Sequence, residues 1–90
     1  MLDVAYTSQF KKDVRRKRRQ GAELGKLDEA ILRLRKGEKL PAALRDHELQ
    51  GVYKGNRECH IEPDWLLIYR VNDEAIVLTA VRTGSHSDLF

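Results

Sequence analysis

Two apolar runs near the C-terminus most constrain the fold of this 90-residue chain. Residues 65–71 and 75–82 are rich in apolar side chains, and the polar sequence Asn72-Asp73-Glu74 separates them. Short runs of this kind, joined by turn-forming residues, are typical of neighbouring antiparallel strands. We therefore expect the two runs to pair inside a sheet, with Gly84 closing the second strand.

The N-terminal segment begins with a strand pattern and changes to helical periodicity. Residues 2–6 predict a short strand, and Thr7 or Ser8 can cap the helix that follows. Tyr6, Phe10 and Val14 recur every four residues, so they predict one helical stripe that faces inward while the basic residues face water.

A second helix is expected over residues 22–36, ending near Gly37. Its apolar stripe consists of Leu24, Leu27, Ile31 and Leu34. Residues 40–44 resemble a connector that includes a turn of helix, and residues 46–51 a polar loop.

Two further strands are expected at residues 51–54 and 57–62, separated by Gly55-Asn56, a weak hairpin signal. Pro63 then favours a tight turn into the strand that starts at Trp65. The element order predicts an α+β fold with an N-terminal strand, a two-helix hairpin and a mainly antiparallel sheet of four to five strands. Residues 1–90 should form a single domain.

Length and composition limit the classes of protein to consider. With 41% hydrophobic residues, the chain can pack a modest core. Its longest apolar run is far too short to cross a bilayer, and Asp3 precedes any signal-peptide core. Cys59 is the only cysteine, so no internal disulfide can form and a core role is the simplest. We therefore expect a cytoplasmic protein without membrane contact.

Positive charge is concentrated in the first half of the chain. Residues 1–45 contain 13 of the 17 lysines and arginines but only 6 of the 14 acidic residues. Most of the excess lies in Lys11, Lys12, Arg15, Arg16, Lys17, Arg18 and Arg19. Such a cluster attracts phosphate backbones without sequence preference, which makes nucleic acid a candidate ligand. A solvated helix face or a surface for an acidic protein partner is the alternative.

Candidate catalytic residues lie in the less basic half. Strand alternation places Cys59 and Ile61 on one face and His60 on the other, away from the predicted helices. Asp64 follows in the adjoining turn, where its carboxylate can contact His60 or bond to its own turn backbone. An imidazole titrates near neutral pH, and Arg82 offers a guanidinium that matches phosphate oxygens.

These residue types suit RNA cleavage by the 2′-hydroxyl. A base removes the hydroxyl proton, an acid protonates the departing 5′-oxygen, and a cation stabilises the phosphorane between them. Trp65 and Phe90 could stack bases, although Trp65 is equally suited to anchor the core. The sequence contains no HExxH, P-loop, GxSxG or metal-ligand cluster, so we expect neither a metal nor a cofactor.

Motifs of the C-terminal half resemble the YafQ branch of the RelE/ParE toxin superfamily. The matching segments are Asp46-His47-Glu48-Leu49-Gln50-Gly51, Tyr53-Lys54-Gly55, His60-Ile61-Glu62-Pro63-Asp64-Trp65 and Arg82-Thr83-Gly84-Ser85-His86. The N-terminal half agrees in element order and basicity. The resemblance implies a RelE-like fold and a toxin of a type II toxin–antitoxin pair. Such a toxin is a metal-independent, ribosome-dependent endoribonuclease that cuts messenger RNA in the A site and inhibits translation.

The resemblance also implies roles at the matching positions. Arg82 would contact the scissile phosphate and His86 would be the general acid, while His60 and Asp64 would form a base or base-orienting pair. His47 would be an auxiliary proton-transfer or phosphate contact. Substrate-binding roles would fall to Trp65, Phe90, Lys54 and Arg57, and ribosome-binding roles to Lys11, Lys12, Arg15, Arg16, Arg18 and Arg19. These roles require the imidazoles and Arg82 to converge on a common hollow.

The implied partners are the ribosome with its messenger and a cognate antitoxin, in a toxin–antitoxin heterotetramer. DNA would be contacted only through that complex. Two alternatives remain open: a ParE-like poison of DNA gyrase, which needs no histidine cluster, and a plain basic RNA-binding domain whose polar residues are structural.

Overall fold

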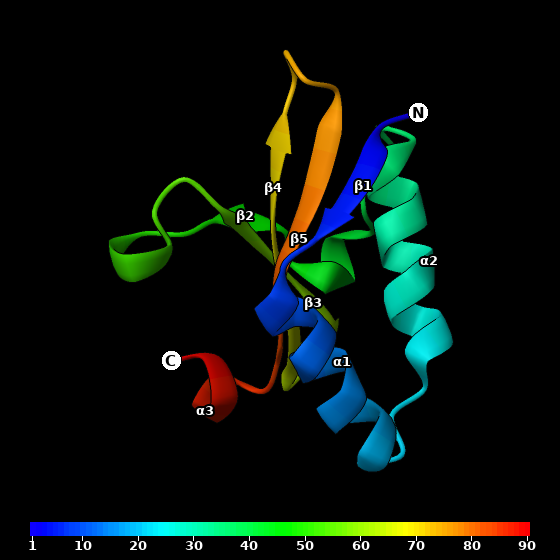
Figure 1. Ribbon diagram of the computed structural model, residues 1–90, viewed down its shortest axis with the longest axis vertical. Helices are drawn as coiled ribbons and strands as arrows, with labels where there is room; N and C mark the ends of the chain where they lie inside the picture. The colour runs from blue at the N-terminus through cyan, green and yellow to red at the C-terminus, as the bar shows by residue number, and fades with distance from the viewer.

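The computed structural model describes residues 1–90 and has the predicted α+β architecture (Figure 1). Its helices and strands are β1 (Asp3–Tyr6), α1 (Ser8–Arg19), α2 (Leu24–Arg35), β2 (His47–Glu48), β3 (Arg57–Glu62), β4 (Trp65–Asn72), β5 (Val77–Gly84) and α3 (His86–Leu89). The five strands form one sheet in the order β1-β5-β4-β3-β2. Only β1 and β5 pair in parallel, so the sheet is mixed and mainly antiparallel.

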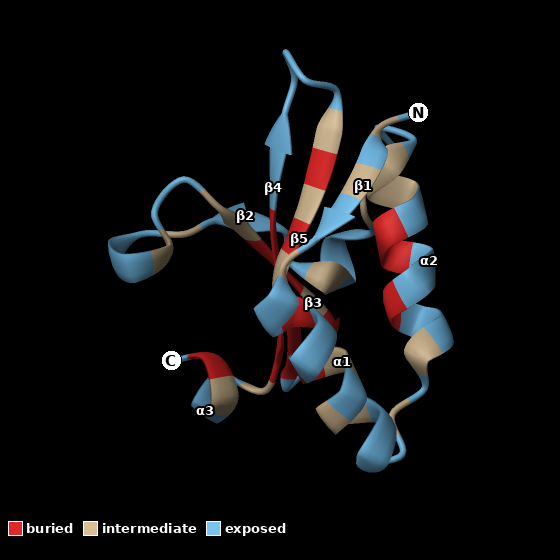
Figure 2. Ribbon diagram, viewed as in Figure 1, coloured by how far each residue is buried: buried red, intermediate tan, exposed pale blue.

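Helices α1 and α2 cover one face of the sheet and bury the main core between them (Figure 2). The core residues on the helices are Phe10, Leu27, Ala30 and Ile31, and those on the sheet are Cys59, Ile61, Trp65, Leu67, Tyr69, Leu78 and Ala80. Burial raises the pKa of the Cys59 thiol to about 12, so this thiol is an unreactive core group.

Thr7 joins the first strand to the first helix. Its side-chain oxygen accepts a hydrogen bond from the backbone N–H of Phe10 at 2.9 Å, which caps α1 as predicted. The same hydroxyl donates to the carbonyl of Val81 at 2.6 Å. This residue therefore fixes the start of α1 to β5.

The opposite face of the sheet carries a second, smaller apolar cluster. Leu66 and Ile68 of β4 are fully buried there beneath Leu89 of α3, with Tyr53 packed against them. Helix α2 does not contact this cluster, which is packed by the short α3 and the segment around Tyr53, while α1 meets this side of the molecule through Asp13 and Arg16. Polar side chains of β2 and β3 on this face therefore remain available for function.

A β-bulge interrupts the pairing of β4 with β5. Ile68 pairs with Arg82 and Tyr69 pairs with Ala80, so Val81 has no partner across the strand. The extra residue shifts the alternation of β5 by one position. Arg82 consequently lies on the face of Ile68, whereas strict alternation from Leu78 and Ala80 would place it under the helices.

Two expectations for the middle of the chain are wrong. Residues 51–53 form a single turn of 3-10 helix instead of a strand, and residues 47–48 of the expected loop form β2. Gly51 has a φ of 69°, a left-handed conformation that a strand does not accept, and Val52 is 97% exposed. Strand β3 therefore pairs with β2, which starts four residues before the predicted hairpin partner at residues 51–54. The expected turn of helix at residues 40–44 is present at Ala42–Leu44.

No helix has the length and apolar character needed to span a membrane.

Candidate active site

One row of paired residues crosses four strands on the face opposite the helices. His47 of β2 pairs with Glu58 of β3, Glu58 with Ile68 of β4, and Ile68 with Arg82 of β5. Residues directly opposite one another on adjacent strands project to the same face. His60 lies two residues after Glu58 and shares that face, as predicted. The sheet itself thus collects residues from distant segments of the chain.

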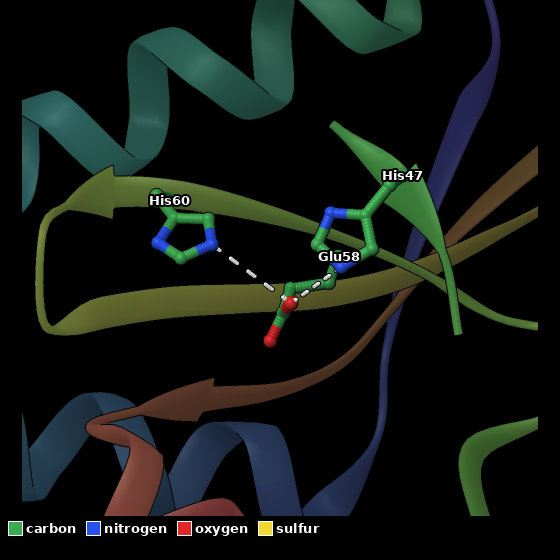
Figure 3. Close-up of side chains that lie close together, drawn as sticks. All are labelled: His47, Glu58 and His60. Carbon is green, nitrogen blue, oxygen red and sulfur yellow. Dashed lines mark ion pairs between the residues drawn. The ribbon is translucent and has the colours of Figure 1, made fainter. Parts of the chain in front are cut away.

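His47 and His60 both point at the carboxylate of Glu58 (Figure 3). The Nε2 atom of His47 lies 3.0 Å from Oε2 of Glu58, and Nε2 of His60 lies 3.9 Å from the same oxygen. The side chain of Glu58 is only 6% exposed, and its Oε1 is buried without a hydrogen-bond partner. Two imidazoles beside one buried carboxylate can exchange protons, and the three groups could also hold a metal ion.

His86 extends this group from the first turn of α3. Its ring lies 5.7 Å from that of His60, and the rings of His47 and His60 are 6.3 Å apart. Ser85 caps α3 with a capping box, in which the N–H of Asp88 donates to Ser85 and the N–H of Ser85 donates to Asp88. The three imidazoles predicted from the sequence therefore come together, as the RNA-cleavage hypothesis requires.

Asp64 pairs with His86, whereas the expected pair was Asp64 with His60. Its Oδ1 accepts the backbone N–H of His86 at 3.0 Å and lies 3.0 Å from Nδ1 of the same residue. The pKa of Asp64 is lowered, first by the backbone hydrogen bond and then by the imidazole. An ionised carboxylate only accepts, so Nδ1 carries the hydrogen and Nε2 of His86 is left for chemistry. His60 instead has its Nδ1 3.4 Å from the carbonyl of Pro63.

Arg82 is held by a buried carboxylate of α1. Its Nε and one terminal nitrogen donate to Asp13 at 2.8 and 3.1 Å, and Asp13 is fully buried. The hydrogen bond that Arg82 donates to Asp13 is the main cause of the raised pKa of Arg82, which Tyr53 also raises. Tyr53 packs edge-on against Phe90, whose ring lies 6.4 Å from that of His86. The rings of Tyr53 and Phe90 thus connect the guanidinium of Arg82 to the imidazole of His86.

The two aromatic residues predicted to hold the substrate have different environments. Phe90 is 63% exposed, so it can stack on a base. Trp65 is 2% exposed, belongs to the main core and donates its indole N–H to Thr83 at 2.9 Å. The substrate-binding assignment of Trp65 is therefore wrong, because strand alternation places its ring on the helix face. Lys17 covers the ring at 5.0 Å, a cation–π contact.

Lys54 and Arg57 are not brought to the histidines. Arg57 donates to Asp46, which also accepts the hydroxyl of the core residue Tyr69. Its guanidinium therefore lies on the helix side of the sheet, which corrects its assignment to the substrate. Lys54 and Arg57 border a separate surface hollow of about 390 Å³.

The basic residues of α1 are mostly free. Lys11, Lys12, Arg15, Arg18 and Arg19 are exposed. Arg16 is the exception, because it pairs with Asp13 at 2.9 Å and approaches Asp88 at 3.9 Å. Helix α1 therefore presents a strip of unneutralised cations to solvent.

No single surface hollow contains the histidine group, whose side chains range from 11% exposed in His60 to 50% and 54% in His47 and His86. None of the five surface hollows is lined by His47, His86 or Arg82, and only one of about 350 Å³ is bordered by His60. The expected common hollow is thus absent. A surface of this kind makes few contacts with a substrate on its own.

Three residues of the site were missed in the sequence. Glu58 precedes His60 by two positions, so strand alternation already placed both on one face. Asp13 is an acid within the most basic segment, a contrast that suggests a paired carboxylate. Tyr53 gave no separate signal, because its position depends on the turn that brings it to α3.

The fold and this group of side chains define a class of small α+β proteins equipped for proton transfer on an open sheet face. The model of the YafQ family, bacterial toxins of type II toxin–antitoxin systems, matches residues 2–90. The mRNA interferase toxin YafQ of Escherichia coli K12 is 40% identical over 89 residues, which cover 98% of this chain and 95% of that protein.

Solved structures agree with this relationship. A metal-bound toxin from Helicobacter pylori has a TM-score of 0.94 at 37% identity, with all of both chains covered. A DinJ–YafQ complex from E. coli has a TM-score of 0.89 at 40% identity, covering 100% of this chain and 99% of that one. The chain therefore belongs to the YafQ family of type II toxin–antitoxin toxins.

Proposed function

We propose that this protein is a ribosome-dependent endoribonuclease that cleaves messenger RNA in the ribosomal A site and thereby inhibits translation. The observation that carries the proposal is the convergence of His47, His60 and His86 around Glu58 and Asp64 on one sheet face. Its relatives named mRNA interferase toxins support the same reaction class. These side chains provide proton donors and acceptors on two sides of a phosphate.

His86 is the proposed general acid. Asp64 orients its ring through Nδ1, and Nε2 delivers a proton to the departing 5′-oxygen. The proposed base is His60 acting with Glu58, which replaces the earlier pairing of His60 with Asp64. His47 shares Glu58 and modulates the same proton. Because these groups interact closely, their titrations belong to the group as a whole.

Arg82 is proposed to stabilise the phosphorane charge. Two of its nitrogens are held by Asp13, so the guanidinium is fixed before the substrate arrives. Phe90, packed against Tyr53, is proposed to stack on a nucleotide of the cleaved codon.

The open surface supports dependence on the ribosome. A site without a hollow cannot by itself hold flexible RNA in line for attack, so it must obtain that orientation from an ordered substrate. The exposed cations of α1 are suited to ribosomal RNA. Efficient cleavage of naked RNA at the same positions would contradict this part of the proposal.

A cognate antitoxin is the proposed inhibitor, as in the DinJ–YafQ complex. An apolar hollow of about 440 Å³ lies between α1 and α2, lined by Phe10, Leu24 and Ile31 and bordered by Lys11 and Arg15. Its chemistry matches an acidic amphipathic segment. Such a segment would also neutralise the cations proposed to contact ribosomal RNA.

The test is messenger cleavage on purified translating ribosomes, with the cut ends mapped. We expect cuts in the A-site codon with the wild-type protein and a loss of at least about 100-fold for His86→Ala and for Arg82→Ala. Arg70→Ala is the matched control for arginine, because Arg70 is exposed and lies outside the site. Far-ultraviolet circular dichroism verifies folding of each variant.

The outcomes separate the alternatives. Full activity of either site variant would remove that residue from the mechanism. Gyrase-trapped DNA breaks in place of A-site cuts would favour the gyrase-poison alternative. If neither A-site cuts nor DNA breaks are found, the plain RNA-binding domain is the alternative that remains.

A further inference from the structure

We propose that the surface hollow between the 3-10 turn at Ala42–Leu44 and the end of β3 holds the nucleobase on the 5′ side of the cleaved bond. The messenger strand then runs in the 5′ to 3′ direction from this hollow, across His60 and His86, to Phe90. The inference deepens the proposed function and takes from it the roles of the two histidines. The hollow receives one nucleobase and not the scissile phosphate, so the ribosome still has to orient the strand.

The hollow lies at the outer edge of the sheet, beside His60. It has a volume of about 350 Å³ and is the only one of the five surface hollows that His60 borders. Strand β2 pairs only with the first two residues of β3, so residues 59–62 have no strand on their outer side. Ala43 and Leu44 of the 3-10 turn instead line the hollow together with Ile61. Figure 3 shows His60 nearer the β3–β4 turn than His47, at the uncovered part of β3.

The chemistry of cleavage places one particular nucleobase next to His60. The attacking hydroxyl is on C2′ of the ribose, and the nucleobase of the same nucleotide is on the neighbouring carbon, C1′. The group that accepts the hydroxyl proton is therefore close to that nucleobase. Nδ1 of His60 lies 3.4 Å from the carbonyl of Pro63, which borders the hollow, and Nε2 lies 3.9 Å from Glu58. The imidazole thus stands between the hollow and the carboxylate.

Three ring positions give the strand its direction. The ring of His86 lies 5.7 Å from that of His60, and the ring of Phe90 lies 6.4 Å from that of His86. In the proposed mechanism, His60 serves the hydroxyl on the 5′ side of the phosphate and His86 serves the departing oxygen on the 3′ side. Phe90 therefore stacks on the nucleotide after the cut, and the hollow is available to the nucleotide before it.

The lining of the hollow suits a nucleobase. Small-molecule sites are mostly apolar and carry a few polar groups that fix orientation. Two charged residues lie at the rim, Arg45 and Glu62. Glu62 is bound by Lys26 at 2.9 Å, whereas Arg45 forms no ion pair, so the rim keeps one uncompensated positive charge for a nucleotide. The apolar part of the lining consists of Ala43, Leu44, Ile61 and Pro63.

The backbone of Arg45 supplies an independent observation. Its φ of 52° and ψ of 47° are left-handed, which is unfavourable for a residue with a side chain. Its N–H donates to the carbonyl of Ala42 at 3.0 Å, and its carbonyl lies 2.7 Å from Nδ1 of His47. Strained residues of this kind are concentrated at functional sites. Arg45 thus joins the rim of the hollow to the histidine group.

Binding is measured first, on the purified full-length protein without ribosomes. The four nucleoside 3′-monophosphates are titrated in turn while proton–nitrogen spectra are recorded. At least one of them should cause saturable shifts at the amides of Ala43 and Ile61. Ala43→Phe, whose ring fills the hollow, should abolish these shifts. Ala42→Phe should keep them, because Ala42 is equally exposed on the same turn but lies outside this hollow. Absence of saturable shifts, or shifts confined to the amides of α1, would overturn the proposal.

Cleavage on ribosomes identifies the nucleotide that the hollow holds. A messenger with an abasic ribose on the 5′ side of the cut keeps the attacking hydroxyl but lacks the nucleobase. The wild type should cleave it at least about tenfold more slowly than the intact messenger. Ala43→Phe should cleave the intact messenger at least about tenfold more slowly than the wild type and lose little more with the abasic one, since residues in contact are not additive. Equal losses in both proteins, or coupling to the nucleotide on the 3′ side, would refute the inference.

Arg45→Asn separates a substrate contact from a structural role. Asn tolerates the left-handed conformation, so the urea midpoint should not fall, while cleavage should fall at least about fivefold. Arg70→Asn removes the same charge at an exposed position outside the hollow and should cleave as the wild type does. Unchanged cleavage by both Arg45→Asn and Ala43→Phe would overturn the proposal.

Failure of the inference and failure of the proposed function give different results. A protein that shows the shifts at Ala43 and Ile61 but cleaves no messenger would refute the proposed function and leave the nucleobase site intact. Cleavage of messenger in the A site without those shifts would leave the function intact and refute the site.

Discussion

Asp13 is an acidic residue in the most basic segment of the chain, and it is fully buried. Its carboxylate accepts hydrogen bonds from Gln9, Arg16, Arg82 and the backbone N–H of Thr83. Burial alone would raise its pKa, but the donors, led by Arg82, outweigh burial and lower it. Asp13 thus joins α1 to β5 and holds the proposed phosphate-binding group.

Replacing this carboxylate should destabilise the protein. Asp13→Asn turns one acceptor into a donor that faces other donors, so we expect a loss of about 2–4 kcal/mol in the free energy of unfolding. Urea denaturation measures this loss. Asp28→Asn is the matched control, because Asp28 is exposed on α2 and should change stability by less than about 0.5 kcal/mol.

Trp65 and Phe90 should separate stability from activity. Trp65→Phe loses the indole hydrogen bond to Thr83 and part of the core volume, so it should cost about 1–3 kcal/mol in unfolding free energy while the folded fraction still cleaves messenger. Phe90→Ala should reduce cleavage at least about tenfold with little loss of stability, because this ring is exposed. Lost activity at full stability in Trp65→Phe would reinstate Trp65 as a substrate contact.

At the scale of elements, the four residues of α3 depend on their cap. A helix this short is not stable by itself, and the capping box of Ser85 and Asp88 satisfies its first N–H groups. Gly84 precedes Ser85 with a φ of 157°, and a side chain there would lie 3.1 Å from the side chain of Asp88, so a larger residue would displace Asp88 of the cap. This short element carries both His86 and Phe90.

Loss of the cap should therefore affect activity more than global stability. Ser85→Ala should cost α3 about 1 kcal/mol, accelerate hydrogen exchange of the Leu89 and Phe90 amides and lower the cleavage rate. Ser8→Ala on α1 is the control, since Ser8 is exposed and Thr7 caps that helix. Unchanged exchange in Ser85→Ala would show that tertiary packing alone holds α3.

The turn between β4 and β5 contains a strained residue. Ile76 has a φ of 57°, which is unfavourable for a β-branched side chain, and it is 57% exposed. Ile76→Asn should raise the free energy of unfolding by about 0.5–1 kcal/mol, because Asn tolerates this conformation. Thermal unfolding measures the gain. Val71→Asn, at an exposed position of β4 without positive φ, should instead be slightly destabilising.

At the scale of the whole molecule, stability should fall in acid. The folded state lowers the pKa values of Asp13, Asp64 and Asp88 below the ordinary value of 3.8. A lowered pKa contributes stability that is fully present above the unfolded pKa and is lost as pH falls through the folded pKa. Urea midpoints should therefore be level above about pH 5 and decline below about pH 4. Stability that rises on acidification would contradict these hydrogen bonds.

The one-sided covering of the sheet relates the fold to the proposed chemistry. Helices α1 and α2 provide the core on one face and the basic surface outside it, while the other face keeps only a small apolar cluster and the polar group. The proposed ribosome attachment and the proposed cleavage thus lie on different layers of one small molecule.

Local patterns in the sequence were enough to predict the α+β class, both long helices and strands β3, β4 and β5. They also indicated the three histidines as candidate proton-transfer groups. Apolar periodicity and turn residues act over a few positions, so they carry this information without knowledge of the fold. The YafQ-like motifs likewise predict His47, His60, Asp64, Arg82 and His86 as candidate site residues.

Contacts between distant segments decided the rest. The bulge at Val81 turns Arg82 to the face opposite the helices. Strand pairing brings Glu58 between His47 and His60. The position of α3 places His86 against Asp64. The same alternation that turns His60 to the face opposite the helices buries Trp65 under α1 and α2. Each of these outcomes depends on register between strands or on packing across the sheet, which no stretch of neighbouring residues specifies.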